Sequence, residues 1–206
     1  MLKFFFAPNT CAVASHIALE EAGAVYETVR VDFRSNQQRS PDYLAINPKG
    51  RVPALATERG TLTETPAILA FIAQSYPAAQ LAPLNDPFEF ARVQAFNSYL
   101  CSTVHVAHAH RVRGYRWADD PAAIAEMQRK VPTTVSDCFE LIETTMFAGP
   151  WVMGANYTIC DPYLFTISQW LDGDGVDIRR FPKVLALSER MHARAAVQRA
   201  LAAQHG

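Results

Sequence analysis

The chain has 206 residues, of which 50% are hydrophobic, so it can bury the core of one large domain or of two small ones. Its formal net charge of −1 at pH 7 argues against a general binder of nucleic acids. No stretch approaches the roughly 18 to 20 apolar residues that a membrane span needs, and the apolar start is too short for a secretion signal. The four cysteines form no CxxC pair, which argues against a zinc ribbon and favours a cytoplasmic protein with free thiols.

The first part of the chain alternates strand and helix patterns. Residues 2–6 form an apolar run that predicts a buried strand, and residues 11–22 predict a helix that Gly23 ends. Residues 25–31 are rich in β-branched side chains and predict a second strand. A polar loop follows, and residues 41–46 predict a short helix.

A hairpin and a third helix complete this part. Residues 52–56 and 61–63 flank the turn Glu58-Arg59-Gly60, which predicts two antiparallel strands. Thr65 is suited to cap a helix that runs to about residue 76, with Pro66 in its first position. The order βαβ then ββα predicts a small mixed sheet with helices packed on it.

Helical patterns dominate after residue 76. Prolines punctuate a linker, and the capping pattern Asp86-Pro87-Phe88-Glu89 opens a long helix toward residue 117. Further helices are expected from residue 120, where Pro132 interrupts the pattern, and after the capping pattern of residues 158–161. We therefore predict an α+β domain over residues 1–77, a linker over 78–86 and an all-helical bundle over 87–206.

Cys11 stands between the first strand and the first helix. A cysteine at a helix N-terminus is favoured as a thiolate, because free N–H groups and the helix dipole stabilise negative charge. The alternative is a small buried cysteine on an apolar helix, since free cysteines are among the most buried residues.

Several motifs carry a resemblance to a known family. Cys11 with Ser15-His16-Ile17-Ala18-Leu19, the run from Tyr43 to Leu55 that contains Asn47-Pro48-Lys49-Gly50, and Glu64-Thr65-Pro66-Ala67-Ile68 are similar to motifs of the cytosolic glutathione transferases, in particular the bacterial beta class. Residues 154–161 match the helix-capping motif of that family. The resemblance covers nearly the whole chain and implies a thioredoxin-like N-terminal domain followed by a helical domain.

The resemblance implies roles for individual residues. Val52 would pair its backbone with the cysteine of glutathione before a cis Pro53, Glu64 would face the γ-glutamyl ammonium, and Thr65 would hold the γ-glutamyl carboxylate. Thr65 as a plain cap and Glu64 as a solvated turn residue are the alternatives. The remaining residues expected to contact glutathione are Thr10, Arg51, Ser98 and Ser102.

The chain departs from the beta-class pattern at several positions. Asn36 stands near a lysine that reaches glutathione in the family, Ala12 replaces the usual serine after the cysteine, and Phe4-Phe5-Phe6 replaces a tyrosine-rich strand. Ser98 stands where the family has an asparagine, and His105 matches a histidine that lies near the thiol. The resemblance makes Cys11 and His105 the candidate catalytic residues.

The segment from His105 to Trp117 is rich in histidine and arginine. A zinc site on His105 and His108 lacks further obvious ligands, and no metal is expected. Arg111, Arg113 and Arg116, with nearby aromatic residues, either line the second-substrate cleft and favour an anionic or aromatic electrophile, or form a solvated basic face.

The expected function is conjugation of glutathione to a small-molecule electrophile by a homodimer. Two alternatives use the same site: a thiol transferase or peroxidase in which Cys11 forms a mixed disulfide with glutathione, and an isomerase or dehalogenase with glutathione as cofactor. A non-catalytic regulatory protein that binds glutathione is a further alternative, because a fold does not determine a function.

Overall fold

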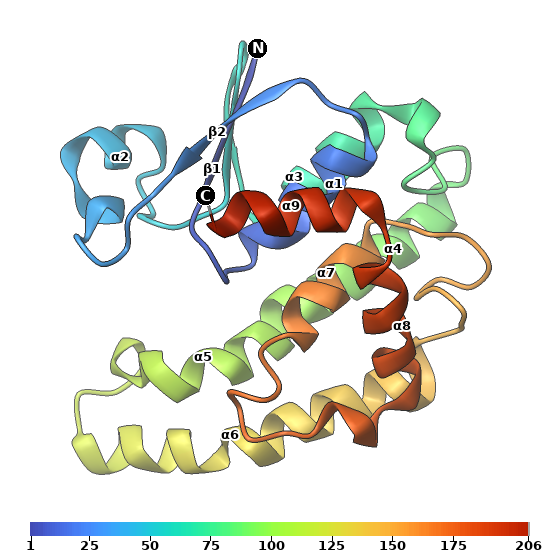
Figure 1. Ribbon diagram of the computed structural model, residues 1–206. Coiled ribbons are helices and arrows are strands. Elements are labelled where there is room, and N and C mark those ends of the chain that lie inside the picture. Colours follow the sequence, from blue (N-terminus) through green and yellow to red (C-terminus); the bar gives the residue numbers. More distant parts are fainter. Residues whose placement is uncertain (206) are drawn as a thin grey trace.

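The structure is a computed structural model that describes residues 1–205 (Figure 1). Its strands are β1 (Leu2–Phe6), β2 (Tyr26–Arg30), β3 (Ala54–Thr57) and β4 (Gly60–Thr63). They form one sheet in the order β2-β1-β3-β4. β1 pairs parallel with β2 and antiparallel with β3, and β4 closes the predicted hairpin. The mixed sheet predicted from the βαβ and ββα order is therefore confirmed.

The sheet and three helices make the N-terminal, thioredoxin-like domain. The helices are α1 (Ala12–Glu21), α2 (Pro41–Ile46) and α3 (Thr65–Ser75). In Figure 1, α1 and α3 lie on the side of the sheet that faces the remaining helices, and α2 lies on the opposite side. The apolar run of β1 is buried because the sheet is covered on both faces: Phe4 is fully buried and its ring stacks on Phe6.

The second domain is helical. It contains α4 (Pro87–Tyr99), α5 (His105–Arg113), α6 (Pro121–Leu141), α7 (Cys160–Ser168), α8 (Pro182–His192) and α9 (Ala195–His205). The predicted cap of α4 is present, because the Asp86 carboxylate accepts hydrogen bonds from the backbone of Phe88 and Glu89. A π-helical turn at Leu100–Val104 joins α4 to α5, so these segments form the long helical unit that the sequence predicts. α6 continues through Pro132.

The last helix returns to the N-terminal domain. α9 packs against α1 and lies across it in Figure 1. Arg194, just before α9, binds Glu21 through two hydrogen bonds of 2.5 and 2.9 Å, and Gln204 bonds to the buried His16 at 2.9 Å. These contacts fix the two domains relative to each other and so fix the cleft between them.

Small differences separate the predicted and observed element ends. α1 begins one residue later than predicted, and β3 begins at Ala54 because residues 52 and 53 are irregular. The prediction that Thr65 caps α3 is wrong: Glu64 is the cap residue, and Thr65 is the first residue of the helix. None of the helices described here is long and apolar enough to cross a membrane.

Candidate active site

A cavity of about 600 Å³ lies between the two domains. The N-terminal domain contributes the loop after β1, the turn before β3 and the start of α3, and the helical domain contributes α5 and the chain around the end of α7. Eight of the ten residues predicted for the site line this cavity: Thr10, Cys11, Arg51, Val52, Pro53, Glu64, Thr65 and His105.

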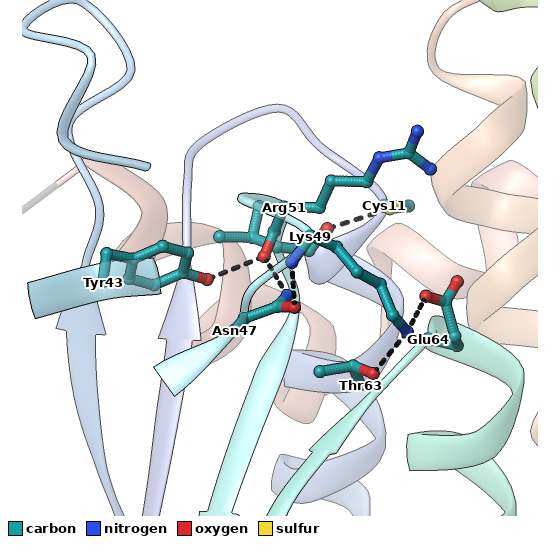
Figure 2. A network of polar contacts seen from close by, with 8 residues as sticks. Cys11, Tyr43, Asn47, Lys49, Arg51, Thr63 and Glu64 are labelled. Atoms are coloured by element: carbon teal, nitrogen blue, oxygen red, sulfur yellow. Dashed lines mark hydrogen bonds and ion pairs between the residues drawn. The ribbon is translucent and has the colours of Figure 1, made fainter. Parts of the chain in front are cut away.

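The loop that presents Val52 is held by two buried side chains. The Tyr43 hydroxyl and the Asn47 amide both donate hydrogen bonds of 2.7 Å to the carbonyl oxygen of Arg51 (Figure 2). Gly50 has a φ of +60°, and a Cβ there would lie 2.8 Å from the backbone oxygen of Gln38, so only glycine fits. The motif around Asn47 and Gly50 therefore shapes the turn before Val52, and the predicted cis bond between Val52 and Pro53 is confirmed.

Glu64 lies at the edge of the cavity in an unusual backbone conformation. Its φ of +72° is rare for a residue with a side chain. Its Oε1 atom accepts a hydrogen bond of 2.6 Å from Lys49 Nζ, which also donates to the Thr63 hydroxyl at 2.8 Å (Figure 2). No group among residues 1–205 donates to Oε2, so this atom is available to a ligand.

Thr65 lies beside Glu64 but is buried, with 4% of its surface exposed. It opens α3, where backbone N–H groups without a helical partner favour an anion. The two residues therefore offer a carboxylate and an anion-binding helix start side by side, which suits an amino acid with both an ammonium and a carboxylate group.

The Cys11 thiol points at the same loop. Its Sγ atom donates to the Val52 carbonyl at 3.7 Å (Figure 2). Burial raises the pKa of the Cys11 thiol, while the Thr65 side chain and the Arg113 charge lower it by smaller amounts. This direction is opposite to the one that the helix N-terminus favours, so burial opposes a thiolate at Cys11 in the protein without a ligand.

Thr10 lines the cavity and also makes two hydrogen bonds within the chain. Its hydroxyl donates to the Ala7 carbonyl at 2.8 Å and accepts from the Ala12 N–H at 3.3 Å. The hydroxyl therefore links the loop after β1 to the first residue of α1 on either side of Cys11.

His105 lies on the helical side of the cavity. Burial lowers its pKa to about 4, and the charges of His108, Arg113, Arg51 and Arg116 act in the same direction. His105 is consequently neutral at pH 7 and offers hydrogen bonds without a charge. Its ring lies 5.0 Å from the Trp170 ring, centroid to centroid.

His108 and Arg111 share one buried carboxylate. His108 Nδ1 lies 2.8 Å from Asp174 Oδ2, and Arg111 Nε lies 3.3 Å from Asp174 Oδ1. The Asp174 side chain is only 2% exposed, and the ring of His108 stacks on Trp170 with a centroid distance of 4.4 Å. These contacts fix His108 and Arg111 at the cavity wall.

Arg113 and Arg116 line the cavity at the end of α5 and in the turn that follows. Tyr115 and Trp117 also line it, with 64% and 47% of their surface exposed. Of the two interpretations of this segment, the placement favours a cleft wall over a solvated face.

Ser98 and Ser102 are not among the residues that line the cavity. Both are exposed on the α4–α5 unit, where the Ser102 hydroxyl donates to the Ser98 carbonyl at 2.8 Å. Within this chain, the structure does not bring them together with the other predicted glutathione contacts.

Sequence reasoning missed four residues of the cavity region. Cys101, Tyr163 and Trp170 line the cavity. Lys49 binds Glu64. Lys49, Cys101 and Tyr163 lie in segments that resemble family motifs, but these motifs gave them no role. Trp170 lies outside them and reaches the cavity through tertiary packing, which leaves no local pattern. Residues 1–205 contain no group of three His, Cys, Asp or Glu side chains placed to hold a metal ion.

Comparisons with known proteins agree with this geometry. The family model of the N-terminal domain of glutathione S-transferases matches residues 1–74. Glutathione S-transferase GstA from Escherichia coli O157:H7 is 32% identical over 206 residues, which cover 98% of each chain. A beta-class glutathione S-transferase from Sphingomonas chungbukensis has a TM-score of 0.85 and 32% identity, with 98% of each chain covered.

A glutathione transferase homologue from Sulfitobacter, solved with bound glutathione, is more similar still. Its TM-score is 0.93 at 47% identity, and the match covers 97% of this chain and 96% of that one. The two named relatives and this homologue are at least 32% identical to the chain over nearly its full length, and the family model matches its N-terminal domain. The chain belongs to the cytosolic glutathione transferases.

Proposed function

We propose that this chain is a glutathione transferase that binds glutathione in the cavity and conjugates its sulfur to an electrophile. The observation that carries the proposal is the set of three neighbouring groups: the Val52 backbone, the Glu64 carboxylate and the buried Thr65 at the start of α3. Glutathione is an extended tripeptide with an ammonium and two carboxylates, and this set offers a partner for its γ-glutamyl group and for its backbone.

The arrangement supports a binding pose. The γ-glutamyl carboxylate binds at Thr65 and the N-terminus of α3, and the ammonium binds Oε2 of Glu64. The cysteine backbone pairs with Val52, which directs the sulfur toward Cys11. Arg51 lines the cavity and has no carboxylate partner among the described residues, so it suits the glycine carboxylate.

The chemical step is a nucleophilic substitution. The glutathione thiol gives its proton to water, the sulfur forms a bond to an electrophilic carbon, and the leaving group departs with the electron pair of the bond that breaks. Arg113, whose charge acts on the Cys11 position, stabilises a thiolate there. Neutral His105 contributes a hydrogen bond to the sulfur or to a water molecule.

Further features of the proposal rest on the resemblance. The protein is a cytoplasmic homodimer, and Ser98 and Ser102 bind glutathione across the dimer interface, which their exposure supports. The N-terminal domain spans residues 1–77 and the helical domain 87–206, joined by a linker.

The test is conjugation of glutathione to 1-chloro-2,4-dinitrobenzene. The wild type should show saturable turnover, and Thr65→Val should raise the KM for glutathione about tenfold, because the variant lacks the buried hydroxyl that binds a carboxylate. Arg59→Gln, an exposed change at the β3–β4 turn, is the matched control and should not alter KM. Catalysis that is absent in the wild type, or unchanged in Thr65→Val, would overturn the proposal.

A second candidate function is thiol transfer by Cys11, and the position of its half-buried thiol in the cavity favours it. The Cys11 thiol loses its proton to water and attacks a disulfide between glutathione and a second thiol, so that Cys11 forms a mixed disulfide with glutathione and the second thiol is released. Reduced glutathione then attacks this mixed disulfide, leaves as oxidised glutathione and restores the Cys11 thiol. Intact mass after incubation with oxidised glutathione tests this step. One reversible adduct that Cys11→Ser abolishes supports thiol transfer, and an unchanged mass refutes it.

A further inference from the structure

The helical side of the cavity carries more positive charge than glutathione needs. Glu64 is the only acidic residue among those that line the cavity in residues 1–205, and Lys49 already binds it. Arginines line both sides: Arg39 and Arg51 from the N-terminal domain, and Arg111, Arg113 and Arg116 from the helical domain. Such a surplus attracts anions into the cavity.

Of the three arginines on the helical side, only Arg111 has an anionic partner within the described residues. It binds Asp174 and donates to the backbone carbonyl of Gly173. Arg113 and Arg116 form no ion pair with a carboxylate in the part of the chain that the structure describes. Two guanidinium groups are therefore free to bind a ligand.

Both arginines line the same cavity as Cys11, and the Arg113 charge acts on its thiol. The Arg113 charge lowers the pKa of the Cys11 thiol, and burial together with the Arg116 charge lowers the pKa of Arg113 itself. Repulsion between the half-buried Arg113 and the exposed Arg116 is unfavourable, and an anion between them relieves it.

Glutathione does not use both groups in the proposed pose. Its two carboxylates lie against the N-terminal domain, at Thr65 and at Arg51, so only its thiolate faces the helical side. One negative charge meets two guanidinium groups, and at least one of them remains for the second substrate. Arg113 is half-buried and its charge lowers the pKa of the Cys11 thiol, whereas Arg116 is exposed on the cavity wall, so Arg116 is the better candidate for the group that remains.

The wall beside these arginines is aromatic. The Trp170 ring lies against His105 and stacks on His108, and Tyr115 and Trp117 line the same side. His110 supports Trp117, with ring centroids 4.6 Å apart. Flat rings on a wall of this kind favour a flat, unsaturated substrate body.

We propose that the second substrate is a carboxylate-bearing electrophile with an aromatic or conjugated body, which Arg116 and Arg113 hold by its carboxylate against the aromatic wall. This inference rests on the proposed function, because it assigns the substrate class of the same cavity. The guanidinium fork matches a carboxylate better than a neutral group, so the site selects acids over their amides.

Two synthetic conjugates test the inference without turnover: S-(4-carboxybenzyl)glutathione and S-(4-carbamoylbenzyl)glutathione. Both contain the whole of glutathione, and they differ in one charge at the far end of the ring. Calorimetric titration should give a Kd for the acid about tenfold below that for the amide, as one charge-assisted contact predicts. In Arg116→Gln and Arg113→Gln this ratio should fall toward one, whereas Arg59→Gln should keep it.

The outcomes separate this inference from the proposed function. Equal binding of acid and amide to the wild type overturns the substrate class and leaves the glutathione site standing. Binding of neither conjugate overturns both. A tenfold ratio that survives in both arginine variants refutes the assignment to Arg113 and Arg116. Arg116 is exposed, so thermal unfolding of Arg116→Gln should match the wild type and confirm that a smaller ratio does not come from unfolding.

Discussion

Replacing Glu64 by glutamine tests how the cavity holds the γ-glutamyl group. The change keeps the shape of the side chain and removes its charge. Oε1 of Glu64 already accepts from Lys49 at 2.6 Å, so the ligand ammonium has the second carboxylate oxygen as its partner. Glutamine offers that ammonium a neutral amide group, or a repelling N–H, in place of a carboxylate oxygen.

The expected loss of affinity follows from the exposure of the site. The Glu64 side chain is 50% exposed, so its contact with an ammonium is weaker than that of a buried ion pair. A partly exposed charge-assisted hydrogen bond contributes about 1.4 kcal/mol, which corresponds to about a tenfold rise in the Kd of glutathione. The same substitution removes the ion pair with Lys49, but both of its side chains are about half exposed, so stability should change little.

Calorimetry with glutathione and N-acetylglutathione isolates this contact. Acetylation removes the ammonium, so it should weaken binding to the wild type by about tenfold and leave binding to Glu64→Gln nearly unchanged. Thr57→Val, on β3 and outside the cavity, is the control and should bind both ligands as the wild type does. If acetylation weakened binding equally in the wild type and in Glu64→Gln, the assignment of Glu64 to the ammonium would be refuted.

Three further predictions concern stability. His105 has a pKa of about 4 in the fold against 6.5 when unfolded, so the free energy of unfolding should fall by up to about 3 kcal/mol from pH 6.5 to 4. In urea titrations, His105→Gln should show a smaller fall over the same pH range than the wild type. An equal fall in both proteins would contradict the prediction. Glu21→Ala removes the two bonds to Arg194 and should lower the free energy of unfolding by about 1.5 kcal/mol; no change in denaturant midpoint would exclude a stabilising role. Asp174→Ala leaves His108 without its buried partner and should lower the free energy of unfolding by about 3 kcal/mol. A thermal midpoint equal to that of the wild type would contradict this prediction.

The strands and helices of the N-terminal domain could be predicted because their patterns are local. The apolar run at residues 2–6 and the β-branched run before Val31 each correspond to a strand. Glu64 and Thr65 could be placed because one motif carries both residues at the start of one helix. The positions of Glu64 and Thr65 depend only on that helix and on the strand before it.

Features that depend on distant packing could not be predicted. Nothing in the local sequence indicates that α9 returns to α1, or that Trp170 stacks on His108. The raised pKa of Cys11 has the same origin: a helix N-terminus is visible in the sequence, but the burial that raises the pKa of this thiol is a property of the folded chain. Arg113 and Arg116 could be named from the sequence, whereas their lack of carboxylate partners among residues 1–205 is a property of the fold.

A crystal structure of the wild type with reduced glutathione would show directly whether the cavity binds the tripeptide in the proposed direction. We predict one glutathione between the domains, with its γ-glutamyl carboxylate at Thr65, its ammonium at Glu64, its cysteine backbone paired with Val52 and its sulfur beside Cys11. Glutathione bound elsewhere, or bound in the reverse direction with its glycine at Thr65, would contradict the assignment of this site.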